Sequence, residues 1–81
     1  MKLRLRFFAS HRDALGQEGR PIKMPEGSTA QHLFDRLASE HPALAVLDER
    51  TLFAVNHEQA GQGRRLKDGD EVALYPPVGG G

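Results

Sequence analysis

The sequence lacks cysteine, lacks an excess of charge of either sign and lacks a long apolar run. The missing thiols exclude disulfides, zinc–cysteine sites and cysteine nucleophiles. Lys+Arg and Asp+Glu both number 11, so no overall field attracts the chain to nucleic acid or to an anionic membrane. We therefore expect no nucleic acid and no membrane among its partners, and recognition through shape and local patches.

The sequence also has no room for a second domain. A chain of 81 residues buries only about 60% of the surface that its unfolded form exposes. A deep cleft enclosed by this chain alone is therefore not expected, and neither is catalysis by the chain on its own. The opening MKLRLRFFAS alternates charged and apolar residues and lacks the continuous apolar run of a signal peptide or membrane span, so we expect a cytoplasmic protein.

Four segments carry strand signals. In residues 2–7, Leu3, Leu5 and Phe7 lie on one side of a period-two alternation and basic residues on the other. This pattern predicts a strand with one buried face and one solvated face. RPIKMP predicts a short edge strand, TLFAVN a buried strand, and EVALYP a last strand that runs directly into the C-terminal residues.

One segment carries a clear helix signal. Ser28 is predicted to cap this helix while Gln31 reaches back, and apolar residues then recur at helical spacing. Pro42 disfavours helical backbone at His41, so the helix is predicted to end there. HRDALGQEG is expected to hold one helical turn, HPALAVLDER a short helix, and HEQAGQGRRLKDGD a glycine-rich loop.

The order of these segments favours one fold class. Strand, strand, helix, strand, strand is the order of an α+β fold in which one helix covers one sheet. We predict a β-grasp (ubiquitin-like) domain over residues 1–77, with a mixed sheet of four to five strands covered by one main helix. Residues 78–81 are predicted to form a flexible C-terminal glycine tail.

Side-chain chemistry gives no candidate active site. The four histidines share no metal-ligand spacing, so no metal site is expected and all four are predicted to lie on the surface. DGD at residues 68–70 lacks the later ligands of a calcium loop and predicts a tight turn. GQG at residues 61–63 lacks both the third glycine and the following helix of a phosphate-binding loop.

The C-terminal YPPVGGG carries the strongest functional signal. Terminal glycines are often merely disordered, or remain from cloning. Here, however, the predicted strand EVALY fixes the start of the segment, and Pro76 and Pro77 keep the backbone extended before the terminal glycines. Glycines pass through channels too narrow for a β-carbon, and residues 78–81 span about 13 Å at ~3.3 Å per residue. This architecture predicts that the carboxylate of Gly81 enters a partner's active site and reacts after adenylation there.

Four segments carry a resemblance to a known family: FFA at 7–9, RDALG at 12–16, AVN at 54–56 and LKDGDEVALYPPVGGG at 66–81. With them, essentially the whole chain resembles the small subunits of molybdopterin synthase, the MoaD family of ubiquitin-like sulfur carriers. DGDEV, PPV and the terminal glycines together are far more specific than two glycines alone.

The resemblance implies a function that needs two partner proteins. An adenylating, MoeB-like enzyme uses ATP to activate the carboxylate of Gly81, which then becomes a thiocarboxylate. A large, MoaE-like synthase subunit receives the tail, and sulfur passes to precursor Z (cyclic pyranopterin monophosphate) to build the molybdopterin dithiolene. The chain itself is implied to bind no cofactor, to be non-catalytic without the large subunit, and to join it in a heterotetramer.

The resemblance also implies roles for individual residues. Gly81 is the reactive residue, Gly80 its necessarily thin neighbour, and Gly79 a permissive position. Tyr75 is implied to face a partner, although a core aromatic on the last strand is an equal alternative. The positions implied to contact partners are Phe8, Arg12, Leu66, Tyr75, Pro76, Pro77, Val78 and Gly79.

Two other interpretations of the sequence remain open. A carrier of the same build could serve thiamine synthesis, tRNA thiolation or protein modification, although PPV before the glycines favours molybdopterin. A non-reactive β-grasp interaction module with an incidental glycine tail is the second alternative.

Overall fold

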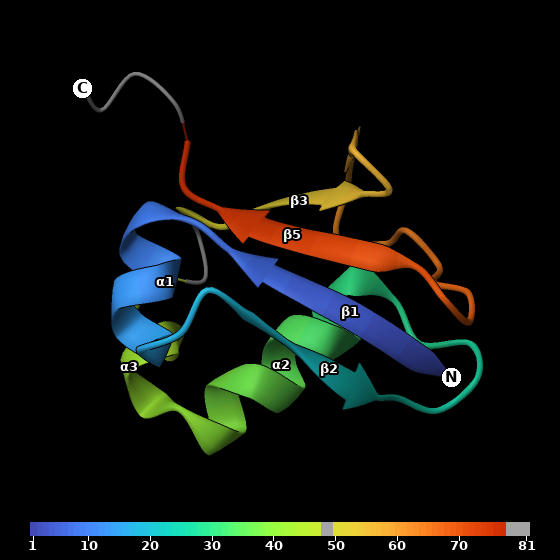
Figure 1. Ribbon diagram of the computed structural model, residues 1–81, viewed down its shortest axis with the longest axis horizontal. Coiled ribbons are helices and arrows are strands. Elements are labelled where there is room, and N and C mark those ends of the chain that lie inside the picture. The colour runs from blue at the N-terminus through green and yellow to red at the C-terminus, as the bar shows by residue number, and fades with distance from the viewer. Residues whose placement is uncertain (48–49, 78–81) are drawn as a thin grey trace.

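The computed structural model describes residues 1–47 and 50–77 (Figure 1). The predicted tail, residues 78–81, lies outside the described residues, so the proposed division into domain and tail stays a prediction. The helices and strands, in chain order, are β1 (Lys2–Phe7), α1 (Ala9–Leu15), β2 (Gly19–Lys23), α2 (Ala30–Glu40), α3 (Pro42–Ala45), β3 (Leu52–Val55), β4 (Glu58–Ala60) and β5 (Glu71–Tyr75).

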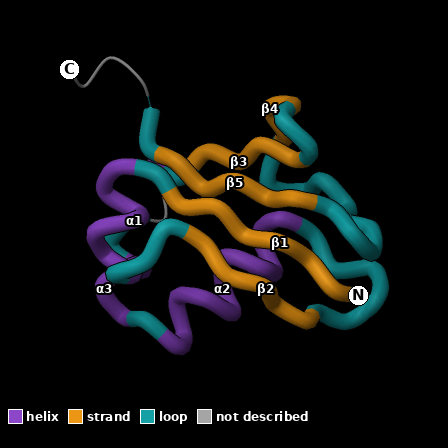
Figure 2. Tube along the Cα trace, in the orientation of Figure 1, coloured by secondary structure: helices purple, strands orange, loops and turns teal. Residues whose placement is uncertain are grey.

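The strands form a mixed sheet in the order β2-β1-β5-β3-β4. The central strands β1 and β5 run parallel, while β2, β3 and β4 each join antiparallel to a neighbour. In the described part of the chain α2 is the longest helix, and it packs its apolar side against the sheet (Figure 2). This arrangement is the β-grasp predicted from the sequence, and the prediction of a short edge strand at β2 is also confirmed.

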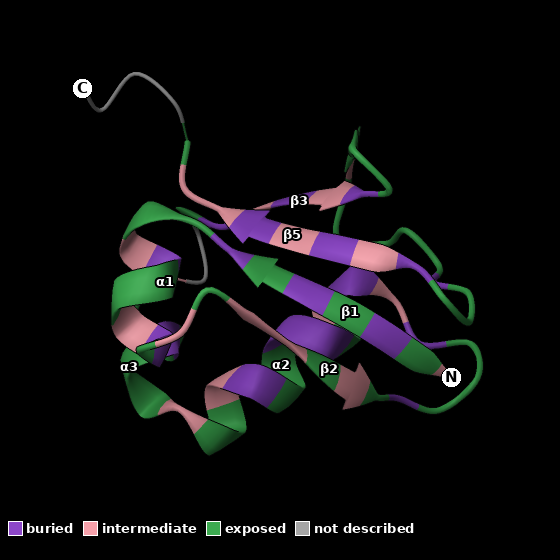
Figure 3. Ribbon diagram, viewed as in Figure 1, coloured by how far each residue is buried: buried purple, intermediate pink, exposed green. Residues whose placement is uncertain are grey.

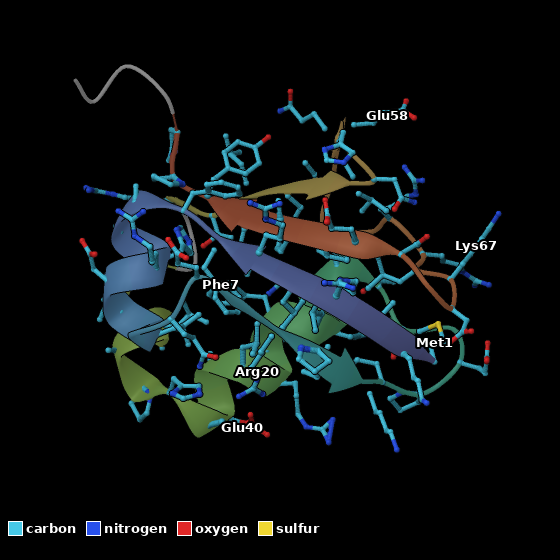
Figure 4. The ribbon with its side chains drawn as sticks, viewed as in Figure 1. Met1, Phe7, Arg20, Glu40, Glu58 and Lys67 are labelled. Atoms are coloured by element: carbon cyan, nitrogen blue, oxygen red, sulfur yellow. The ribbon has the colours of Figure 1, made fainter. Side chains whose placement is uncertain are left out.

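The core lies between the helices and one face of the sheet. Burial alternates along β1, β3 and β5, so every second side chain of each strand joins the core (Figure 3). Phe34 of α2 meets Phe53 of β3 edge to face, with ring centroids 6.4 Å apart and an interplanar angle of 86°. Arg20 of β2 reaches Glu40 at the end of α2, with Nη2 and Oε1 3.0 Å apart (Figure 4). The sheet therefore has one covered face and one open face.

The main helix begins one residue later than predicted. Thr29 is its N-cap: its hydroxyl accepts a hydrogen bond from the backbone N–H of His32, and the Nδ1 atom of His32 accepts one from the N–H of Thr29. The predicted cap, Ser28, instead donates its hydroxyl to the carbonyl of Pro25 at 2.7 Å. The predicted end at His41, before Pro42, is confirmed.

The predicted glycine-rich loop contains one strand that the sequence did not indicate. β4 forms a hairpin with β3, and the two residues between the strands, Asn56 and His57, have φ angles of 52° and 71°. The favoured sequence for such a turn has glycine second, which is absent here. The tight turn at residues 68–70 is confirmed: Gly69 has a φ of 88°, and the Asp70 carboxylate accepts from Asn56 Nδ2 and from the backbone N–H of Lys67.

The prediction that all histidines lie on the surface is wrong for His11. This residue of α1 is fully buried, with Nε2 2.7 Å from the hydroxyl oxygen of Thr51. The Thr51 hydroxyl donates its proton to the carbonyl of Leu47, so it accepts from Nε2–H of His11. Burial of the ring lowers the pKa of His11, which favours the neutral form.

Candidate functional site

The last strand, β5, is the middle strand of the sheet, and the chain leaves the sheet at its C-terminal end. β5 pairs with β1 on one side and with β3 on the other, up to the pair Leu52 and Tyr75. The backbone N–H of Phe8 donates to the carbonyl of Leu74 at 3.2 Å, next to the end of the strand. Any segment that follows Tyr75 therefore starts from a backbone held on both sides (Figure 1).

The open face of the sheet carries an apolar patch beside this exit, formed by Phe8, Ala54, Ala73 and Tyr75. The register places Ala54 opposite Ala73, and Tyr75 follows two residues later on the same face of β5. These four residues line a hollow of about 400 Å³, together with Arg6, His57 and Glu71. The two alanines provide a flat floor between the aromatic side chains, which is a shape that an apolar partner group can enter.

Phe8 is the exposed anchor of the apolar patch. Its side chain is 41% exposed, and its place in a contiguous apolar patch, rather than its exposure alone, marks an interaction surface. The guanidinium carbon of Arg6 lies 5.6 Å from the centre of the Phe8 ring, at cation–π distance. Arg6 thus lies over one face of the ring, while much of the Phe8 side chain stays exposed.

The structure decides the alternative for Tyr75. Val72 and Leu74 point into the core, whereas Tyr75 is half-buried on the open face, so it is not a core aromatic. Pro76 is half-buried and Pro77 exposed immediately after the strand. Arg12 is exposed on α1, where a polar contact with a partner is open to it.

Leu66 does not lie where the sequence predicted it. Its side chain is 4% exposed and belongs to the core cluster, and its backbone N–H donates to the carbonyl of Ser28 at 2.9 Å. The segment before β5 packs against the start of α2, so Leu66 serves the fold and does not form part of the exposed surface. The predicted residues Val78, Gly79, Gly80 and Gly81 lie outside the described residues.

Sequence reasoning missed Arg6, Ala54 and Ala73 as parts of the site. Ala73 could have been found, because it shares the face of Tyr75 by simple alternation. Arg6 and Ala54 each lie beside Ala73 only because β1 and β3 pair with β5, and strand pairing is not visible in one sequence. Their addition turns a set of isolated predicted contacts into one continuous patch.

Most residues of the patch are apolar, which suits binding of an apolar partner group. The titratable pair on its border is His57 and Glu71, with Nε2 and Oε2 3.3 Å apart, and the His57 side chain is 82% exposed. Within residues 1–47 and 50–77, no three His, Asp or Glu side chains gather as a metal site would require. No helix in the same described ranges has the length and apolar character needed to cross a membrane.

Curated relatives match the chain over its whole length. It is 32% identical to the molybdopterin synthase sulfur carrier subunit of Chlamydomonas reinhardtii, covering 100% of both chains. It is 36% identical to the protein of the same name from Escherichia coli, over 98% of this chain and 99% of that one. It is also 32% identical to small archaeal modifier protein 3 of Haloferax volcanii, again over 100% of both.

Solved structures agree with these relatives. The crystal structure of SAMP1 from Haloferax volcanii matches with a TM-score of 0.85 and 28% identity, over 100% of both chains. A chain from the complex of subunits 1 and 2 of the molybdopterin-converting factor of Helicobacter pylori matches with a TM-score of 0.70 and 28% identity, also over 100% of both. The resemblance inferred from the sequence is confirmed. The sequence profile of the ThiS family matches residues 5–81, and the chain therefore belongs to the ThiS family.

Proposed function

We propose that this chain is the sulfur carrier subunit of a molybdopterin synthase, with the sulfur carried as a thiocarboxylate on Gly81. One observation carries the proposal: the chain matches proteins of that name from end to end at 32–36% identity. The geometry supports it, because the tail follows a strand held at the centre of the sheet, beside an exposed apolar patch.

The chemistry proposed for Gly81 requires activation by another protein. An α-carboxylate has a pKa of about 3.3–3.7 and is a poor electrophile when ionised. Attack of this carboxylate on the α-phosphorus of ATP, with release of pyrophosphate, gives an acyl adenylate. Hydrosulfide then displaces AMP from the acyl carbon, and loss of the proton leaves the thiocarboxylate. We assign the ATP-dependent step to a separate MoeB-like adenylating enzyme.

The thiocarboxylate suits a chain that has no cysteine. Its negative charge lies largely on sulfur, so it is nucleophilic at neutral pH for the reason that a thiolate is. We propose that its sulfur attacks precursor Z in the active site of the large, MoaE-like subunit, and that water then cleaves the bond between this sulfur and the acyl carbon, which returns the Gly81 carboxylate. Positioning by that subunit makes sulfur transfer effectively unimolecular, which lowers the barrier by several kcal/mol.

We assign the apolar patch and the two prolines to docking. Phe8 and Tyr75 offer aromatic area at the base of the tail, and interfaces are enriched in such residues. The structural relative from Helicobacter pylori was solved as a complex of subunits 1 and 2, which supports a large-subunit partner here. We propose the same pairing for this chain, in a cytoplasmic heterotetramer.

A second candidate function is protein modification. It is favoured by the full-length similarity to small archaeal modifier protein 3 at 32% identity. The same activated carboxylate of Gly81 would then form an amide with an amine of another protein. Both functions share the adenylation step and differ in the nucleophile that follows.

Intact-mass spectrometry tests the sulfur carrier directly. The chain is expressed together with a MoeB-like enzyme, and a species heavier by the difference between sulfur and oxygen is expected. Two controls, deletion of Gly81 and addition of one residue after it, should abolish this species and leave the far-UV circular dichroism unchanged. Formation of molybdopterin from precursor Z with the large subunit completes the test.

Two results would contradict the sulfur carrier. One is full synthase activity from the chain that lacks Gly81. The other is an activated chain that never gains sulfur and instead becomes joined to lysines of other proteins, which would favour the modifier.

A further inference from the structure

The open face of the sheet carries a second surface feature, a strip of positive charge. It consists of four exposed side chains: Lys2, Arg4, Arg6 and Lys23. Alternation along β1 directs the first three to the open face, and pairing of Lys2 with Lys23 extends the strip onto β2. The chain has no net charge, so this basic strip arises from segregation of charge and not from an overall excess.

The neighbours of the basic strip leave most of its charge available. Arg20 points to the helix side, where it pairs with Glu40 (Figure 4). Glu71 lies beside Arg4 in the parallel register, but its carboxylate is 3.3 Å from His57. Within the described ranges, the ion pairs found do not include any of the four side chains of the strip.

The middle of the strip is hollowed. The register places Pro21 opposite Arg4 and Gly19 opposite Arg6, so β2 contributes no long side chain there. The two arginines border a hollow of about 480 Å³ that these residues also line, together with the carboxylate side chains of Glu18 and Glu71. The two guanidinium groups offer N–H donors to a carboxylate side chain that enters from a partner.

The strip is continuous with the apolar patch through one residue. Arg6 belongs to the strip, stacks on Phe8, and lines the hollows on both sides. A partner that covers the apolar patch therefore also removes water from Arg6. Desolvating a cation without a counter-charge is costly, so such a partner has to offer carboxylates along the strip.

We propose that the basic strip binds an acidic segment of the same protein that receives the tail. This inference rests on the proposed function, which makes that protein the large synthase subunit. A protein suits this face better than a nucleic acid, because the strip adjoins the apolar patch, which needs apolar contact area from its partner. The strip steers the partner and fixes its orientation, while the apolar patch supplies contact area.

Association kinetics with the purified large subunit test the inference. The full chain and its double variant Lys2→Glu/Arg4→Glu are compared by stopped flow at about 0.02 M and about 0.5 M NaCl. Arg6 is left intact, so the ring contact with Phe8 is kept. The matched control is Arg64→Glu/Arg65→Glu, which changes the net charge equally at exposed positions against the start of α2.

The expected effect is kinetic and sensitive to salt. At low salt the strip variant should associate about 10-fold more slowly than the wild type, and the neutral variant Lys2→Gln/Arg4→Gln about 3-fold more slowly. At high salt these differences should shrink below about 2-fold. The control should stay within about 2-fold of the wild type at both salt concentrations.

Three results would overturn the inference, and they are distinguishable. If the wild type binds and the strip variant associates as fast as the control, the strip has no role and the proposed function stands. If the wild type does not bind the large subunit at either salt concentration, the proposed function fails and this inference fails with it. If the variant binds the subunit normally but loses binding to a short fluorescein-labelled single-stranded DNA, the strip belongs to a nucleic-acid surface.

Discussion

The two faces of the sheet are built from alternate residues of the same strands, yet they have opposite chemistry. Along β1, Leu3, Leu5 and Phe7 are at most 3% exposed, while the basic residues between them face water (Figure 3). Along β5, Leu74 is fully buried and the next residue, Tyr75, lies in the apolar patch. Adjacent residues of one strand thus contribute to different properties, one to stability and the next to recognition. Substitutions one residue apart should therefore affect either folding or partner binding.

The largest effect is expected on the covered face. Leu74→Ala removes a side chain with 0% exposure from the centre of the core. The lost burial and the remaining cavity should lower the free energy of unfolding by about 2–5 kcal/mol. Urea denaturation followed by circular dichroism measures this loss.

Leu74→Ala should lose partner binding only to the extent that the variant is unfolded. The affinity for the large subunit should therefore be near normal wherever the variant is still folded. A folded Leu74→Ala chain that cannot bind the large subunit would show that the covered face also contributes directly to recognition.

The neighbouring residue should give the reverse pattern. Tyr75→Ala removes an aromatic side chain from the open face, where it lines the hollow beside the tail. We expect a loss of about 2 kcal/mol in binding to the large subunit, or roughly 30-fold, as for a central aromatic of an interface. The stability should fall by about 1 kcal/mol or less, since strand preferences span only about that range.

Titration calorimetry with the large subunit measures the effect of Tyr75→Ala. Tyr75→Phe is the control, because it keeps the ring and should retain most of the affinity. Equal affinities for the alanine variant and the wild type would remove Tyr75 from the docking surface.

A buried polar group on the helix side should make stability depend on pH. The neutral His11 ring donates to Thr51, and burial lowers its pKa from the ordinary value of 6.5. The unfolded chain therefore binds a proton at pH values where the folded chain does not. The contribution of His11 is full above about pH 6.5 and is lost as the pH falls from there through the folded pKa, by at most about 1.4 kcal/mol per pH unit.

Unfolding by urea at several pH values between about 5 and 8 measures this dependence. His11→Gln is the control, because it keeps an N–H donor and does not titrate in this range. Its stability should vary less below about pH 6.5 than that of the wild type. Parallel curves for the two proteins would show that His11 protonates equally in both states.

The sequence alone was enough for features that depend on local pattern. Alternation located β1 and β5, helical spacing located α2, and proline and glycine placed the end of α2 and the turn at residues 68–70. The chemistry assigned to Gly81 also came from sequence, and it stays a proposal because that residue lies outside the described part.

The features missed depend on contacts between distant segments. Leu66 is buried because its segment packs on the start of α2, with the N–H of Ala30 bonded to the carbonyl of Arg64. His11 is buried with its ring N–H hydrogen-bonded to the hydroxyl of Thr51, which lies forty residues further on. The hairpin of β3 and β4 was missed because Asn56 and His57 adopt positive φ angles without a glycine.

That hairpin turn gives the smallest predicted effect. His57 has a φ of 71°, a conformation that is costly for a residue with a β-carbon and free for glycine. His57→Gly also creates Asn-Gly, the favoured pair for such a turn. The substitution gives up the contact between the exposed His57 ring and Glu71, and exposed polar contacts of this kind are worth little in water. We expect the free energy of unfolding to rise by about 0.5–1 kcal/mol.

His57→Ala separates the two contributions, because it loses the same contact with Glu71 but keeps a β-carbon at the strained position. Urea denaturation should therefore rank glycine above the wild type, and alanine equal to it or slightly below. Since His57 borders the apolar patch only at its edge, neither variant should weaken binding to the large subunit by more than about 2-fold. A large loss of affinity in both variants would show that the docking surface extends from the patch to the hairpin. A larger part of the open face would then take part in recognition.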